Sequence, residues 1–108
     1  MDEPFDFEFH TDEESLREDL RADAEMALRG LAEEYSGITG AAVSVERMTR
    51  ATVPHRFRAR IVLYMQPSNM VAVEKDDTAA GALRKALQAI ERQVSERREK
   101  LVERWQQP

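Results

Sequence analysis

The sequence contains no cysteine, and this absence excludes a whole set of functions. Without thiols there are no disulfides, no thiolate nucleophile and no cysteine-ligated zinc or iron–sulfur centre. No apolar run approaches the ~20 residues that a membrane-spanning helix needs. The first residues, 1–4, carry neither the basic region nor the apolar stretch of a signal peptide. We therefore expect a cytoplasmic protein in a reducing compartment, with no membrane among its partners.

Groups that catalyse reactions or hold metal ions are also scarce. His10 and His55 are the only histidines, and neither has a second ligand at metal-binding spacing. The carboxylates at 12–14 stand at a predicted helix start, where they interact favourably with the helix dipole. The sequence has no glycine-rich phosphate loop, and none of its serines has a histidine–acid pattern nearby. We expect a protein that is not an enzyme and needs no cofactor, metal ion or small-molecule substrate.

Charge is abundant, and it is unevenly distributed. Charged residues make up 34% of the 108, and the net charge is −5. Residues 1–39 hold thirteen acidic residues against three arginines, whereas 40–108 hold thirteen basic against eight acidic residues. This asymmetry favours one surface suited to a polyanion, with a purely solvating role as the alternative. The length, without repeats or linkers, predicts a single domain over 1–108 with its core at about 5–105.

The spacing of apolar residues predicts six elements in the order strand, helix, three strands, helix. Their expected ranges are 5–10, 12–36, 42–48, 56–65, 71–75 and 78–105. Thr11 and Glu14 form a capping box before the first helix, and Asp76 or Asp77 is the expected cap of the second. The predicted fold is α+β, a four-stranded sheet with two helices packed on one face, like a double-stranded-RNA-binding domain. The expected core residues are Phe5, Phe7, Phe9, Phe57, Ile61, Leu63, Leu83, Leu87 and Ile90.

The third predicted strand carries three arginines on one face. Arg56, Arg58 and Arg60 alternate along it, ~7 Å apart, close to the spacing of successive phosphates in a nucleic-acid strand. Adjacent like charges repel, so they favour an anionic partner. The alternative is neutralisation by Glu46 or Glu74 on neighbouring strands. The last predicted helix adds the basic residues Arg84, Lys85, Arg92, Arg97, Arg98, Lys100 and Arg104.

The last predicted helix resembles that of the ribosome hibernation-promoting factor and ribosome-associated inhibitor A family. Residues 86–94, followed by Arg98-Glu99-Lys100-Leu101, are similar to the family's Leu-Glu-Arg-Gln-Leu core and its Lys-Glu-Lys-Leu-like end. Residues 55–61 resemble the family's third strand, and the predicted element order is also the family's. The resemblance implies a non-enzymatic protein that binds the ribosomal RNA of the small subunit. Family members occupy the decoding channel and silence translation in stationary phase or stress.

Basic side chains contact ribosomal RNA in that family, which implies roles for individual residues here. Arg92, Arg98 and Lys100 match basic positions of the family's last helix. Lys85 has no such counterpart and is included for its charge. The complete set of candidate RNA-binding residues is therefore Arg56, Arg58, Arg60, Lys85, Arg92, Arg98 and Lys100.

The first predicted helix departs from the family, because it is acidic where the family's helix is often basic. Its acidic residues are Glu18, Asp19, Asp23, Glu25, Glu33 and Glu34. Such a surface fits a high-salt cytoplasm or a changed partner. The alternative interpretation is therefore a divergent family member that acts as a protein-interaction module without tight ribosome binding. The sequence leaves the oligomeric state open.

Overall fold

The computed structural model describes residues 5–48 and 56–106, with side chains described up to Glu99. One sheet contains β1 (Asp6–Thr11), β2 (Ile38–Arg47), β3 (Phe57–Met65) and β4 (Met70–Asp76), in that order. The helices are α1 (Arg17–Glu34) and α2 (Ala79–Gln106). β1 runs parallel to β2, whereas β2, β3 and β4 pair antiparallel. The α+β fold predicted from the sequence is confirmed.

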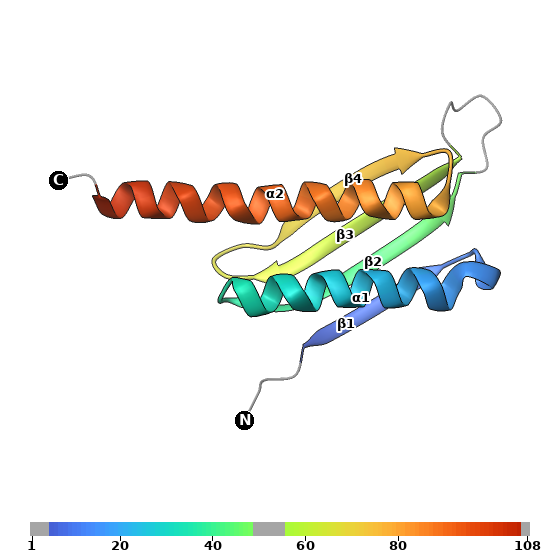
Figure 1. Cartoon of the computed structure of the whole chain (residues 1–108), viewed down its shortest axis with the longest axis horizontal. Helices are drawn as coiled ribbons and strands as arrows, with labels where there is room; N and C mark the ends of the chain where they lie inside the picture. Colours follow the sequence, from blue (N-terminus) through green and yellow to red (C-terminus); the bar gives the residue numbers. More distant parts are fainter. Residues whose placement is uncertain (1–4, 49–55, 107–108) are drawn as a thin grey trace.

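Both helices cover the same face of the sheet (Figure 1). α1 packs on β1 and β2, and α2 packs mainly on β3 and β4. The C-terminal end of α2 continues past the end of the sheet (Figure 1). The fully buried side chains of the core include Val45, Ile61 and Leu63 from the sheet and Leu28 and Ile90 from the helices. This layered core leaves the other face of the sheet open.

The expected core is correct for its central members and wrong at one edge. Phe57, Ile61, Leu63, Leu83 and Ile90 are buried. Phe5, Phe7, Phe9 and Leu87 are only partly buried against the core. Phe7 and Phe9 lie on β1 and Phe5 directly precedes it, and this edge strand has a neighbouring strand on one side only. Their rings stack with centroids 6.5 and 6.4 Å apart along that edge.

The predicted capping box is wrong, because Thr11 is the last residue of β1. Its Oγ1 donates to the carbonyl of Val45 at 2.7 Å and accepts from the backbone N–H of Glu13 at 3.1 Å. A short 3-10 turn over Glu14–Leu16 follows, and α1 begins at Arg17 without a side-chain cap. The Thr11 hydroxyl, which the local sequence pattern predicts as a helix cap, is therefore engaged in a tertiary hydrogen bond to β2.

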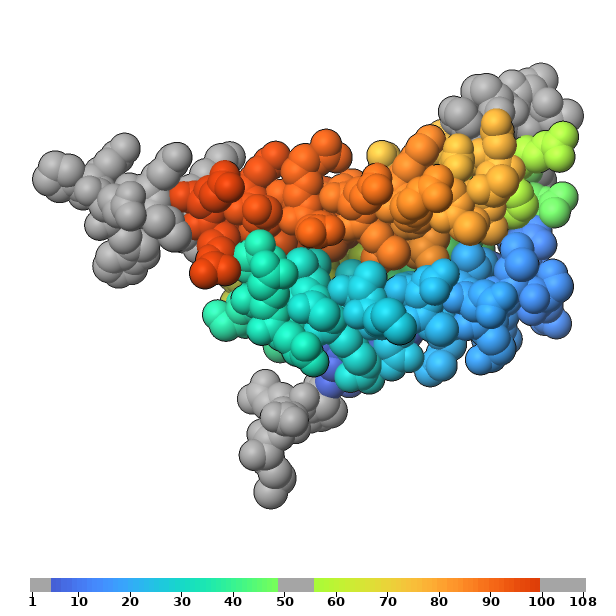
Figure 2. All heavy atoms as spheres, viewed as in Figure 1, coloured from blue at the N-terminus to red at the C-terminus, as the bar shows by residue number. Residues whose placement is uncertain are grey.

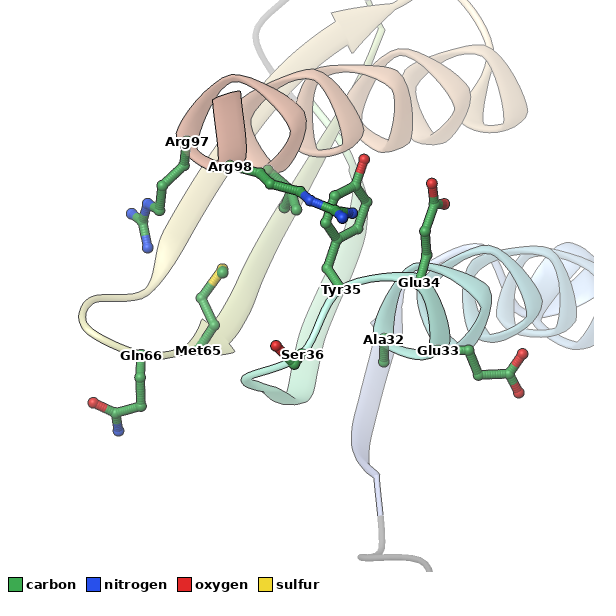
Figure 3. Close-up of a pocket in the computed structure, with 10 residues that line it drawn as sticks. Ala32, Glu33, Glu34, Tyr35, Ser36, Met65, Gln66, Arg97 and Arg98 are labelled. Carbon is green, nitrogen blue, oxygen red and sulfur yellow. The ribbon is translucent and has the colours of Figure 1, made fainter. Parts of the chain in front are cut away.

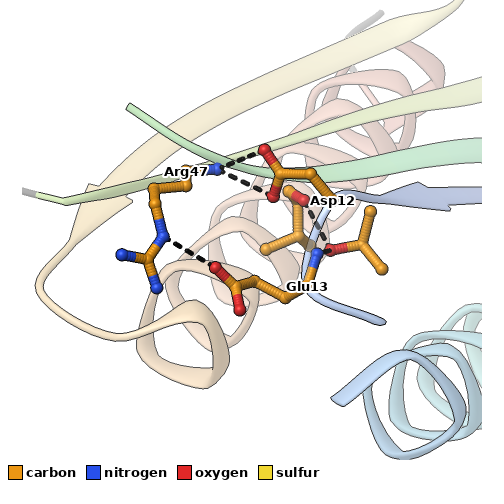
Figure 4. Close-up of polar contacts among 5 residues, drawn as sticks. Asp12, Glu13 and Arg47 are labelled. Carbon is orange, nitrogen blue, oxygen red and sulfur yellow. Dashed lines mark hydrogen bonds and ion pairs between the residues drawn. The ribbon is translucent and has the colours of Figure 1, made fainter. Parts of the chain in front are cut away.

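Arg47 at the end of β2 holds the connection between β1 and α1 (Figure 4). Its backbone N–H lies 3.0 and 3.1 Å from the two carboxylate oxygens of Asp12. Its Nε donates to Glu13 Oε1 at 2.8 Å, and its guanidinium lies 5.2 Å from the centre of the Phe57 ring. The carboxylates at 12 and 13 therefore both bond to the last residue of β2.

The second helix matches its predicted range closely, and Thr78 makes an N-cap bond at its start. Thr78 Oγ1 accepts from the backbone N–H of Gly81 at 2.9 Å, which is the bond that an N-cap residue makes. Thr78, which makes this bond, directly follows the two expected caps, Asp76 and Asp77. Asp76 Oδ1 lies 3.2 Å from the Nζ of Lys85, which is the seventh residue of α2. The predicted loop at 49–55, with His55, lies outside the described residues.

Candidate nucleic-acid interface

The open face of the sheet is formed by the alternate side chains that point away from the helices. On β3 these include Arg58 and Arg60, which are exposed between buried neighbours. The strand register places Glu46, Arg58 and Lys75 in one row across β2, β3 and β4. Arg56 is also exposed and directly precedes β3. The structure thus places the three candidate arginines on or beside one open surface.

These arginines differ in their surroundings. Arg58 Nη2 lies 3.4 Å from Glu46 Oε2, with both side chains more than 40% exposed. Glu74, the other acid considered as a partner, pairs in register with the buried Ala59 and so faces the helices. Arg60 stands between Ser44 and Val73 in its row and forms no ion pair with the described side chains. Among the ion pairs of the described residues, Glu46 therefore neutralises Arg58, through a weak exposed pair.

The candidate residues on α2 form a second group. Arg92 is exposed, and Lys85 is held by Asp76. Arg98 lies over the ring of Tyr35, 5.2 Å from its centre, which ties α2 to the end of α1. Lys100 belongs to the backbone of α2, but its side chain lies outside the described residues.

A cavity of about 510 Å³ lies between the end of α1, the β3–β4 turn and α2 (Figure 3). Arg97 and Arg98 reach into this region from α2, and Glu33 and Glu34 line it from α1. Arg97 is anchored to the turn, because Nη1 donates to the Ser68 carbonyl at 2.8 Å and Nη2 lies 3.3 Å from Ser68 Oγ. The walls of the cavity carry both acidic and basic side chains, so the cavity does not favour a polyanion. The sequence alone does not indicate this role of Arg97, because Ser68 is distant from it along the chain.

The two groups of candidate residues project from opposite faces of the sheet layer but from the same lateral half. Arg58 and Arg60 point away from the helices, whereas α2 covers the other face of β3 and β4. A flat, rigid ligand cannot contact both groups. A ligand that passes around the β4 edge, or surrounds the protein, can reach both.

The opposite lateral half is acidic on both faces. Asp6 and Glu8 are exposed on the open face of β1. On the helix side, α1 exposes Glu18, Asp19 and Asp23, while Glu25 pairs with Arg21 and Arg29. Figure 2 shows α1 and α2 side by side, together covering this side of the molecule. The charge asymmetry of the sequence thus becomes a charge gradient across the strands.

Within the described residues, no cluster of three or more potential metal-ligating side chains occurs. No helix in the same part of the chain is long and apolar enough to cross a membrane.

Comparison with known proteins assigns the chain to a family. The family model of the sigma 54 modulation protein / S30EA ribosomal protein matches residues 8–102. No curated protein matches the chain significantly in sequence. The N-terminal domain of Protein Y from Thermus thermophilus has a similar structure, with a TM-score of 0.68, 19% identity, and coverage of 84% of this chain and 96% of that domain.

A ribosomal subunit interface protein from Coxiella burnetii is also similar in structure. Its TM-score is 0.70 at 12% identity, over 88% of this chain and 99% of that protein. At such identities the structural similarity establishes the fold, whereas the family model spans most of the chain. The chain belongs to the sigma 54 modulation protein / S30EA ribosomal protein family, which confirms the resemblance found in its last helix and strand order.

Proposed function

We propose that this protein is a ribosome-associated translation inhibitor that binds small-subunit ribosomal RNA in the decoding channel during stress or stationary phase. The observation that carries this proposal is the family match over residues 8–102, which spans the fold from β1 into the end of α2. The similarity to a ribosomal subunit interface protein supports it. Because ribosomes lie in the cytoplasm, the proposal also assigns the protein to that compartment. The protein acts by occupying space and contacting phosphates, without catalysis.

The position of the basic side chains suits a partner that surrounds one half of the molecule. Arg58 and Arg60 are exposed on the open face of the sheet, and Arg92 is exposed on α2, which covers the other face of β3 and β4, so the two groups suit opposite walls of a channel. RNA on both sides of that edge contacts both groups at once, which a single flat duplex does not. The acidic half fixes the orientation, because the carboxylates of Asp6 and Glu8 repel phosphates.

Co-sedimentation with 30S and 70S ribosomes at two salt concentrations tests the proposal. Each phosphate contact releases condensed counterions, so we expect pelleting at low salt and its loss at high salt. The variant Arg56→Gln/Arg58→Gln/Arg60→Gln removes the sheet group, and Arg92→Gln/Arg98→Gln removes described members of the helix group. Each variant should weaken pelleting, and in-vitro translation should recover in parallel. Loss of two contacts should reduce the slope of log affinity against log salt by about 1.5.

The matched control neutralises charge on the acidic half. Glu18→Gln/Asp19→Asn/Asp23→Asn changes three exposed residues of α1 and should leave pelleting unchanged or strengthen it. If this control abolishes partner binding while both arginine variants retain it, the ribosome proposal is wrong and the protein-interaction alternative is favoured. That alternative has one specific feature in its support, since Met26 is 76% exposed on the acidic helix.

A further inference from the structure

A shallow depression of about 250 Å³ lies on the open face of the sheet, above β2. It exists because β2 presents small side chains there, Ala42 and Ser44, between longer side chains on β1 and β3. The lining residues are Glu8, Phe9, His10, Ala42, Val43, Ser44, Arg60 and Val62. Because all three strands are paired in register, the backbone that frames the depression is rigid.

The register arranges different chemical groups around this depression. One row contains His10, Ser44 and Arg60, and the next contains Glu8, Ala42 and Val62. The floor is therefore apolar at Ala42 and Val62, with the Ser44 hydroxyl beside it. One wall carries the exposed carboxylate of Glu8, and the opposite wall carries the exposed guanidinium of Arg60. No described side chain forms an ion pair with either charge.

We propose that this depression binds one unstacked base of single-stranded RNA that carries an exocyclic amine, with the adjoining phosphate on Arg60. This inference rests on the proposed function, because it specifies how the open face of the sheet engages RNA. The base lies over Ala42 and Val62, and its amine donates to the carboxylate of Glu8. A glutamate side chain accepts a hydrogen bond from the N4 amine of cytosine, whereas uracil has a carbonyl at that position.

The charges on either side of the depression fix the direction in which such a nucleotide lies. Arg58, Arg60 and Lys75 form the basic side on β3 and β4, and Asp6 and Glu8 form the acidic side on β1. The phosphates are attracted to the basic side and repelled from the acidic side, so the uncharged base points toward Glu8. A duplex cannot present a base in this way, because its bases are stacked and paired.

Apolar surface beside the depression suits the remaining part of a nucleotide strand. Val71 and Val73 on β4 are each 45% exposed on this face. They lie next to Val62 and Arg60 in the register, on the basic side. A strand whose phosphates follow the arginines therefore passes over a surface that receives the riboses.

Fluorescence anisotropy with short single-stranded oligo(C) and oligo(U) tests the inference. The two probes have pyrimidine rings of equal size and differ in the amine. The full chain should bind oligo(C) about fivefold or more tightly than oligo(U), the lower range of discrimination for a well-placed base contact. Glu8→Gln should abolish this preference, because the amide presents one acceptor and adds a donor.

Filling the depression provides a second test that leaves the charges unchanged. Ala42→Leu should weaken oligo(C) binding about fivefold or more. The control Ala27→Leu makes the same change at an exposed position of α1, on the other side of the sheet, and should change binding by less than about twofold. Ser44→Val fills the site independently if Ala42→Leu unfolds, and thermal unfolding of each variant establishes that it is folded. Unchanged oligo(C) binding in the folded filling variants, or equal binding of both probes by the full chain, overturns the inference.

Ribosome pelleting of the same proteins separates this inference from the proposed function. If the full chain pellets with ribosomes but shows no oligo(C) preference, the base site is refuted and the proposed function stands. If it prefers oligo(C) but does not pellet with ribosomes at low salt, the ribosome proposal fails and the site binds another single-stranded RNA.

Discussion

Replacing Gly81 by alanine tests how firmly the start of α2 is held, and Gly30 in α1 provides a matched control. Alanine in place of glycine inside a helix ordinarily stabilises a protein by about 0.5–1 kcal/mol, because the unfolded chain loses freedom. A Cβ at Gly30 meets no heavy atom within 4 Å. Gly30→Ala should therefore give the full gain in the free energy of unfolding.

At Gly81 the same methyl group meets the groups that begin the helix. It would lie 2.7 Å from Thr78 Oγ1 and in still closer contact with Asp76 Oδ2. Displacing Thr78 costs the N-cap bond, about 1 kcal/mol. Displacing Asp76 weakens its pair with Lys85, which is partly exposed and worth about 0–1 kcal/mol. These losses exceed the propensity gain, so Gly81→Ala should destabilise by about 0.5–1 kcal/mol.

Urea denaturation of both variants measures the difference, which should be about 1–2 kcal/mol at an unchanged m-value. Adding Asp76→Ala removes the nearest obstacle, so Gly81→Ala should cost less in that background than in the wild-type chain. If Gly81→Ala stabilises as much as Gly30→Ala, the carboxylate and the cap move aside freely. In that case Asp76 and Thr78 do not hold the start of α2 in place.

Three further substitutions test other parts of the fold by urea denaturation. Ile61→Ala should lower the free energy of unfolding by about 2–5 kcal/mol, because this side chain is completely buried between the sheet and the helices. A smaller loss would mean that the core collapses around the cavity left by the substitution. Thr11→Val should lower the free energy of unfolding by about 1–3 kcal/mol, since the Val45 carbonyl loses the hydrogen bond from the Thr11 hydroxyl. Thr11→Ser keeps a hydroxyl at this position and should retain most of the wild-type stability. Arg97→Ala should change stability by less than about 0.5 kcal/mol, because its bonds to Ser68 are exposed, and a large loss would show that the turn depends on them.

The sequence predicted the elements well wherever burial is strictly periodic. The period of two in β3 correctly separated buried Ile61 from exposed Arg60. The helical spacing of apolar residues predicted the bounds of α2 to within about a residue. The start of α1 was predicted wrongly, because Thr11 has the same local pattern whether its hydroxyl caps a helix or bonds to β2. Only the long-range pairing of β1 with β2 distinguishes the two.

The candidate interface shows the same division between local and long-range information. Alternation along β3 predicted that Arg58 and Arg60 share a face. Alternation alone could not decide whether Glu46 or Glu74 lies on that same face. The register places Glu46 beside Arg58 and turns Glu74 toward the helices. The depression above β2 depends on three strands meeting side by side, so no single segment of the sequence indicates it.

The topology also explains how a charge difference along the sequence becomes one in space. The acidic first part of the chain, residues 1–39, supplies β1 and α1, and α1 packs back onto β1 and β2, the two strands that it connects. The basic second part supplies β3, β4 and α2, and α2 packs mainly onto those strands. Each part therefore contributes both a strand layer and a helix layer, so the charge boundary runs between lateral halves and not between faces. An RNA partner that is attracted to the basic half approaches the β4 edge. From that direction it contacts the arginines of the open sheet face and those of α2 at the same time.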